Sequence, residues 1–65
     1  MKKYIDKMQI EKADLEGKIA RVEKVIATNH FDLDETGRYL LEKQVQAMKV
    51  YLDFLEQRIH YEMGE

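Results

Sequence analysis

The sequence contains no proline, no cysteine and no serine, and it has only three glycines in 65 residues. Together with 45% hydrophobic and 37% charged residues, this composition is typical of long helices and excludes a β-rich or disordered chain. Without cysteine there is no disulfide and no thiolate metal site. Because the usual serine and cysteine nucleophiles are missing, we expect no enzymatic activity.

Charge and hydropathy limit the classes of partner that this protein is expected to bind. Eleven Lys and Arg residues against thirteen Asp and Glu residues give a formal charge of −2, so we expect no duplex nucleic acid partner. The N-terminal segment reaches Asp6 without opening into an apolar run. This pattern predicts no secretion signal, no membrane span or membrane partner, and a cytoplasmic location.

Residues from about 2 to 28 are predicted to form one amphipathic helix, because good helix formers fill the segment and its apolar residues recur at helical intervals. At about 100° per residue these apolar residues fall within roughly 60°, the narrow seam typical of coiled-coil packing. The expected seam consists of Tyr4, Met8, Leu15, Ile19, Val22 and Ile26, flanked by Ile5 and Val25. Ile10 is expected to point to solvent, and Asp14 is expected to pair with Lys18.

Residues 29–34 interrupt this period and offer two starts for a second helix. Asp32 would form an Asp version of the capping box with Glu35, whereas Asp34 would leave Leu33 as an apolar residue just before the cap. We favour Asp34. The other expectations for the turn are that Leu33 and Phe31 close the hairpin core and that His30 is solvated.

The second helix is predicted over residues of about 35–63, and its apolar arc is much wider. At about 100° per residue the arc spans about 200°, of which one partner helix covers about half. Its central residues are Leu41, Val45, Met48, Leu52, Leu55, Ile59 and Met63, and its outer residues are Leu40, Ala47, Phe54 and Tyr61.

The predicted fold class is therefore all-α, with residues 1–65 forming a single antiparallel two-helix hairpin. A chain this short rarely stabilises itself by more than ~3–5 kcal/mol from one core. The outer residues of the wide arc would also be left exposed, which is unusual for a monomer. We expect a homo-oligomeric helical bundle, either a dimeric four-helix bundle or a higher closed assembly, with the outer residues at the interface.

Three polar residues spaced by seven form a line along the second helix, beside the outer part of the arc: Gln44, Tyr51 and Arg58. An arginine, a tyrosine and an amide suit the phosphate, base and ribose of a nucleotide. A structural role is the commoner use of such residues, in which the Gln sets the register between helices and the Arg pairs with a partner's acid. Tyr39 and Tyr61 are either aromatic walls of the same site or amphipathic rim residues.

Metal binding is not expected. Residues 32–37 match the start of an EF-hand calcium loop, but Lys43 occupies the twelfth position, where a bidentate Glu is needed. His30 and His60 fall at opposite ends of the predicted hairpin and cannot share a metal within one chain. We therefore expect no metal and no cofactor.

A longer pattern spreads over most of the chain. Residues 40–51, LLEKQVQAMKVY, are continued by 55–59, LEQRI, and are preceded by a helix that contains Glu11, Leu15 and Lys18. The pattern of Leu-Leu, then Gln, Met and Tyr at intervals of three, four and three, then Leu and Arg-Ile, resembles a family of short tailed-phage proteins that includes relatives of a small crAss-like phage product. The resemblance covers residues 4–59.

The resemblance implies a phage-encoded, all-helical accessory protein that acts in the host cell cytoplasm. Small phage proteins of this kind often counter host defence. Two functions are then open: a sponge that sequesters a nucleotide-derived immune signal between protomers, or a module that binds and blocks a host defence protein. In the second case, as in a purely structural oligomer, the three polar residues serve assembly alone.

Overall fold

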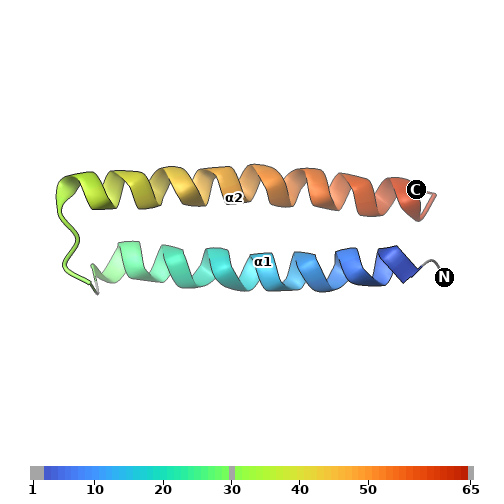
Figure 1. The fold of residues 1–65 in the computed structure, drawn as a ribbon, viewed down its shortest axis with the longest axis horizontal. Coiled ribbons are helices and arrows are strands. Elements are labelled where there is room, and N and C mark those ends of the chain that lie inside the picture. The colour runs from blue at the N-terminus through green and yellow to red at the C-terminus, as the bar shows by residue number, and fades with distance from the viewer. Residues whose placement is uncertain (1–2, 30, 65) are drawn as a thin grey trace.

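In the computed structural model, which describes residues 3–29 and 31–64, two long helices run antiparallel. Helix α1 spans Lys3–Thr28 and helix α2 spans Glu35–Glu62. The helices lie side by side along their whole length, with the turn at one end and both described chain ends at the other (Figure 1). The hairpin measures 46 × 15 × 13 Å. The predicted all-α hairpin is confirmed.

The turn is built on two residues with left-handed backbone conformations. Asn29 and Asp32 both have φ of 50°, a region that Asn and Asp tolerate better than other non-glycine residues. Asn29 directly follows α1: its carbonyl accepts from the Asp32 amide at 2.9 Å, and its side-chain Oδ1 accepts from the Leu33 amide at 3.0 Å. These bonds reverse the chain over a few residues. The expectation for His30 lies outside the described residues.

Helix α2 begins at the residue that the sequence favoured. Asp34 is the N-cap, and its Oδ1 accepts a hydrogen bond of 2.7 Å from the Gly37 amide, one of the donors that a helix start leaves without a backbone partner. The alternative start at Asp32 is wrong. Arg38 then reaches across the hairpin, where its Nη2 donates to the Ile26 carbonyl of α1 at 2.9 Å. That carbonyl lies in the last turn of α1, so the bond satisfies an acceptor that the helix itself cannot.

The core is a single seam between the helices, divided into two clusters. Ile5, Met8, Leu55 and Ile59 form one cluster near the chain ends. Leu15, Ile19 and Val45 form the other, with Val22, Ile26, Met48 and Leu52 packed against it. Leu55 has no exposed surface at all and is the best-buried side chain described.

Three expectations about the seam are wrong. Tyr4 is 46% exposed, and Ile5 takes its place at 5%, because the tyrosine keeps its hydroxyl at the surface and donates it to the Glu62 carboxylate. Phe31 is 67% exposed and does not close the core. Met63 is 50% exposed because it is the C-cap of α2, where the helix no longer holds it against α1.

The outer part of the apolar arc on α2 faces away from α1. Leu40, Phe54 and Tyr61 are 59%, 58% and 80% exposed, and Ala47 is exposed as well. We call these four residues the apolar stripe. Over the described residues, neither helix has a stretch apolar enough to cross a bilayer.

Removal of the N-cap tests the start of α2. Asp34→Ala is expected to lower the free energy of unfolding by about 1 kcal/mol, because the Gly37 amide loses its acceptor. For a chain of this size that corresponds to a decrease of about 4–8 °C in Tm, measured by circular dichroism at fixed concentration. Asp32→Asn is the matched control, since it also removes one negative charge from the turn but keeps a residue that tolerates positive φ. Equal effects of the two variants would contradict this capping role.

Truncation of the best-buried side chain tests the seam. Leu55→Ala is expected to cost about 2–5 kcal/mol, because it leaves a cavity between Ile5, Met8 and Ile59. Urea titration followed by circular dichroism measures the loss. The control is Ile10→Ala on the exposed side of α1, where the side chain is 63% exposed and the change is expected to stay within about 0.5 kcal/mol. A tolerated Leu55→Ala would mean that the helices are not held by this seam.

Candidate functional site

The two long edges of the hairpin differ in chemistry. Along one edge polar groups of the two helices are bonded to each other: Lys49 Nζ lies 2.7 Å from Glu23 Oε2, and Arg38 holds the Ile26 carbonyl. Within α2, Arg38 Nε also lies 3.6 Å from Glu42 Oε1. We call this side the paired edge.

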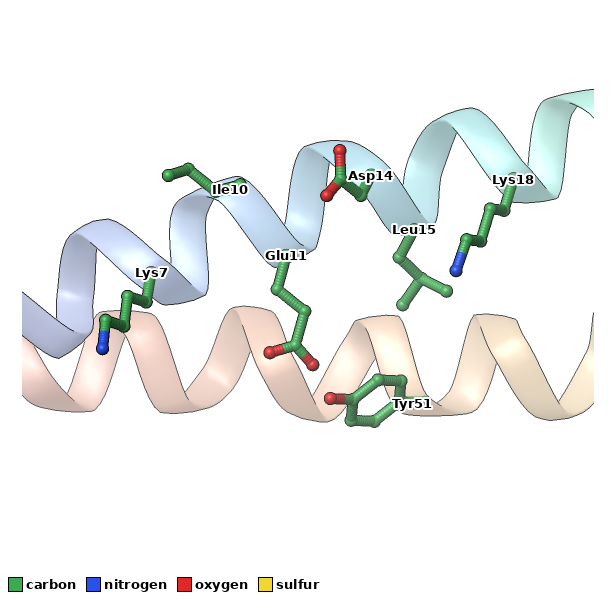
Figure 2. A pocket seen from close by; sticks show the side chains of 7 residues that line it. All are labelled: Lys7, Ile10, Glu11, Asp14, Leu15, Lys18 and Tyr51. Carbon is green, nitrogen blue, oxygen red and sulfur yellow. The ribbon is translucent and has the colours of Figure 1, made fainter.

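The opposite edge carries an open groove of about 440 Å³, which we call the open edge. On α2, Tyr51 lies about 160° around the helix from Lys49, which places the two edges on opposite sides of the seam. The groove is lined by Lys7, Ile10, Glu11, Asp14, Leu15, Lys18 and Tyr51. Figure 2 shows the Glu11 side chain extending from α1 toward Tyr51, with Lys7 and Lys18 on either side and Ile10 turned away from α2.

The charged groups of this groove are not used within the hairpin. Lys7, Glu11, Asp14 and Lys18 form no ion pair with another described residue, so the expected Asp14–Lys18 pair is wrong. Two ammonium groups can bind phosphate, and two carboxylates can accept hydrogen bonds from ribose hydroxyls or base amino groups. Tyr51, 46% exposed, offers a ring face for stacking. This set of groups suits a small polar ligand that carries both an anionic and a hydroxyl-rich part.

The three polar residues predicted from their spacing lie next to this groove. Gln44, Tyr51 and Arg58 are all exposed, and none of their side chains forms a hydrogen bond or ion pair with another described residue. Tyr51 lines the groove, whereas Gln44 and Arg58 lie outside its lining. At about 1.5 Å per residue they sit about 10 Å to either side of Tyr51 along α2. We call Gln44, Tyr51 and Arg58 the polar line. They occupy the strip of α2 between the open edge and the apolar stripe.

The two additional tyrosines lie farther around α2. Tyr39 is 56% exposed, and the Lys43 ammonium lies 5.5 Å from the centre of its ring. By helix geometry Tyr39 is about 120° from Tyr51, whereas Tyr61 belongs to the apolar stripe. Neither ring is part of the groove lining within one hairpin.

Sequence reasoning missed the contribution of α1 to the groove. Positions 7, 11, 14 and 18 follow intervals of four and three, so they share one side of the helix, but charged residues at such spacing are usual on a solvated face. The signal that marks them is their adjacency to Tyr51, which exists only once the two helices are placed together.

Among residues 3–29 and 31–64, no group of three His, Asp or Glu side chains is placed to hold a metal ion. In the segment that resembled a calcium loop, the Asp34 carboxylate accepts from the Gly37 amide as the cap of α2.

The chain belongs to the Sequestin family, whose family model matches residues 2–61. The match includes α1, the turn and nearly all of α2, and therefore the groove and the polar line. No curated protein and no solved structure matches the chain. This match is consistent with the small family predicted from residues 4–59, and an origin in tailed phages stays a prediction.

Proposed function

We propose that this protein is a non-enzymatic binding protein that sequesters a nucleotide-derived signal in a homo-oligomer, between protomers. The observation that carries the proposal is the open edge, where four unpaired charged side chains and an exposed tyrosine ring surround one groove. The family name, Sequestin, is compatible with a sequestering role.

The polar line on α2 extends this groove toward the apolar stripe. Arg58 offers five donors in a planar arrangement that matches phosphate oxygens, and Gln44 can both donate to and accept from a base or ribose. Because the line borders the stripe, a second protomer that covers the stripe would lie against the same polar groups. This adjacency favours a ligand site that lies between two protomers.

Binding without turnover is the activity that the residue types support. The chain contains no serine or cysteine, and the groove combines lysines, carboxylates and a tyrosine without a histidine. A protein that only holds its ligand needs affinity and a sufficient number of sites. In the phage context that the resemblance implies, the ligand is a host immune signal and the site of action is the host cytoplasm.

A second candidate function rests on the apolar stripe itself. Leu40, Phe54 and Tyr61 are more than half exposed, and such a surface can receive a helix of a host defence protein instead of a second copy. In that case Gln44, Tyr51 and Arg58 serve only assembly.

Calorimetric titration tests the sequestering function. With cyclic oligonucleotides and ADP-ribose derivatives as the panel, we expect at least one compound to bind at micromolar protein concentration. Arg58→Ala should weaken that binding by about tenfold or more, because it removes charge-assisted hydrogen bonds to phosphate. Tyr51→Ala should weaken it through loss of stacking.

Gln44→Ala should also weaken nucleotide binding, because it removes the amide of the line on α2. Gln46→Ala is the matched control for this variant and for the two above. Gln46 is an exposed amide on α2 that lines a groove on the paired edge, so its removal should leave the titration unchanged. Absence of heat across the whole panel with the wild-type protein would refute nucleotide sequestration.

Substitution of Phe54 tests oligomerisation through the stripe. Phe54→Glu places one unpaired charge per protomer in the proposed interface, at a cost of several kcal/mol. We expect the variant to dissociate and to lose helicity, because the isolated hairpin buries too little surface to hold itself. Light scattering measures the mass and circular dichroism the helicity.

Gln46→Glu is the control, since it adds the same charge to an exposed position on the paired edge. A wild-type protein that is a stable monomer at micromolar concentration, or a Phe54→Glu variant of unchanged mass and melting, would contradict the oligomer.

A pull-down from host lysate separates the two candidate functions. Sequestration predicts that a small nucleotide, identified by mass spectrometry of the bound fraction, copurifies with the protein. If a stoichiometric host protein copurifies and no nucleotide is present, the blocking function replaces the sequestering one.

A further inference from the structure

The apolar stripe is complementary to itself when it is reversed. Its four residues are spaced by seven, and their midpoint falls between residues 50 and 51. When a second α2 packs antiparallel about that point, Leu40 lies opposite the partner's Tyr61 and Ala47 lies opposite the partner's Phe54. The small alanine thus receives the large phenylalanine ring at both inner positions, as a packed interface requires.

The antiparallel orientation also separates the two Arg58 side chains. In a parallel pair the two Arg58 residues would stand at the same height along the helices. In the antiparallel pair the two arginines are about 15 residues apart along the helices, or about 22 Å. The exposed stripe of one copy therefore fits the stripe of a second copy in one orientation.

The same register aligns the polar lines of the two protomers. Gln44, Tyr51 and Arg58 are also spaced by seven and are centred on nearly the same point. Reversal about the midpoint brings Tyr51 within about one residue, or 1.5 Å of rise, of the partner's Tyr51. It also brings Gln44 to within one residue in height of the partner's Arg58.

The two-fold axis that relates the two α2 helices runs perpendicular to both of them. It therefore places the α1-facing sides of both helices on the same side of the pair. The polar lines of the two protomers therefore lie on one face of the helix pair, between the open edges of the two hairpins. Figure 2 shows one of these open edges, where Glu11 of α1 extends toward Tyr51 and Lys7 and Lys18 lie to either side.

We infer that two α2 helices pair antiparallel about residues 50 and 51, and that this pairing creates two equivalent nucleotide sites, each completed by Gln44 of one protomer and the partner's Arg58. This inference rests on the proposed sequestering function and assigns its geometry. Each site has a tyrosine ring at the two-fold axis and a guanidinium about 10 Å away, a span that suits a base stacked on the ring and a phosphate on the arginine.

The cationic ends of the pair define the ligand class further. In this register Lys43 lies at the height of the partner's Arg58, on the other margin of the stripe, so two positive charges share each end. A ligand that carries a phosphate compensates this repulsion, whereas a neutral nucleoside does not. The site is therefore assigned to nucleoside phosphates, one per protomer and two per dimer.

Cysteine cross-linking tests the register without any ligand. The chain has no cysteine of its own, so single substitutions report cleanly. A mixture of Ala47→Cys and Phe54→Cys proteins should form a disulfide-linked heterodimer under mild oxidation, while each variant alone should stay unlinked, because identical positions lie about 10 Å apart along the axis. Leu40→Cys mixed with Tyr61→Cys is a second pair with the same expectation, in case loss of Phe54 weakens the dimer.

Links within each single variant would indicate parallel pairing and would overturn the register. Absence of a link in both mixtures would overturn it as well. Gln46→Cys, on the paired edge, is the control that should not link in any mixture.

Complementation tests the shared site. Gln44→Ala and Arg58→Ala proteins are each expected to bind the nucleotide about tenfold or more weakly than the wild type. After mixing and subunit exchange, about half of the dimers contain one of each, and one of the two sites in those dimers is intact. Calorimetry on the mixture with the nucleotide that binds the wild type should therefore recover about one quarter of the wild-type sites at wild-type affinity.

If the wild type binds and the mixture shows no recovery, each site lies within one chain, and the composite site is wrong while sequestration stands. If the wild type binds no nucleotide of the panel, the proposed function fails and the composite site fails with it. The cross-links then still report whether α2 pairs in this register.

Discussion

The seam centred on Leu55 is the constraint from which the other features of the hairpin follow. Two helices alone can bury only the sides that face each other, and here that contact reduces to two small apolar clusters. The remaining described residues of both helices are exposed or only partly buried. The 3.6-residue period then assigns each remaining residue to an edge or an outer face, so the chemistry of the protein is arranged around the seam in longitudinal strips.

The difference between the two edges separates structure from function. On the paired edge, the Arg38 bond and the Lys49–Glu23 pair join the helices at two heights and thereby help to define how they lie against each other. The open edge has a similar number of charged groups, but Lys7, Glu11, Asp14 and Lys18 remain available to a ligand. Exposed ion pairs contribute little stability, so leaving this edge unpaired costs the fold little.

The helices, the turn and the Asp34 cap were predictable from the sequence because each depends on local spacing and capping chemistry. Errors arose at the ends of the seam, where Ile5 replaces Tyr4 and where Phe31 and Met63 stay exposed, because packing there depends on how far the second helix reaches. The groove was only half predictable. Tyr51 was found from its heptad spacing on α2, whereas its neighbours on α1 look like an ordinary solvated face until the helices are placed side by side.

A seven-residue repeat relates assembly to binding in α2. The apolar stripe and the line of Gln44, Tyr51 and Arg58 have the same period and adjacent positions, so the contact that would cover one also organises the other. If cationic groups of two protomers converge at each end of the pair, they oppose association until an anion neutralises them. Linkage then requires the reverse effect, in which a nucleoside phosphate strengthens the dimer to the same extent that the dimer strengthens its binding. In a chain this small, ligand and partner would thus act together to stabilise the folded state.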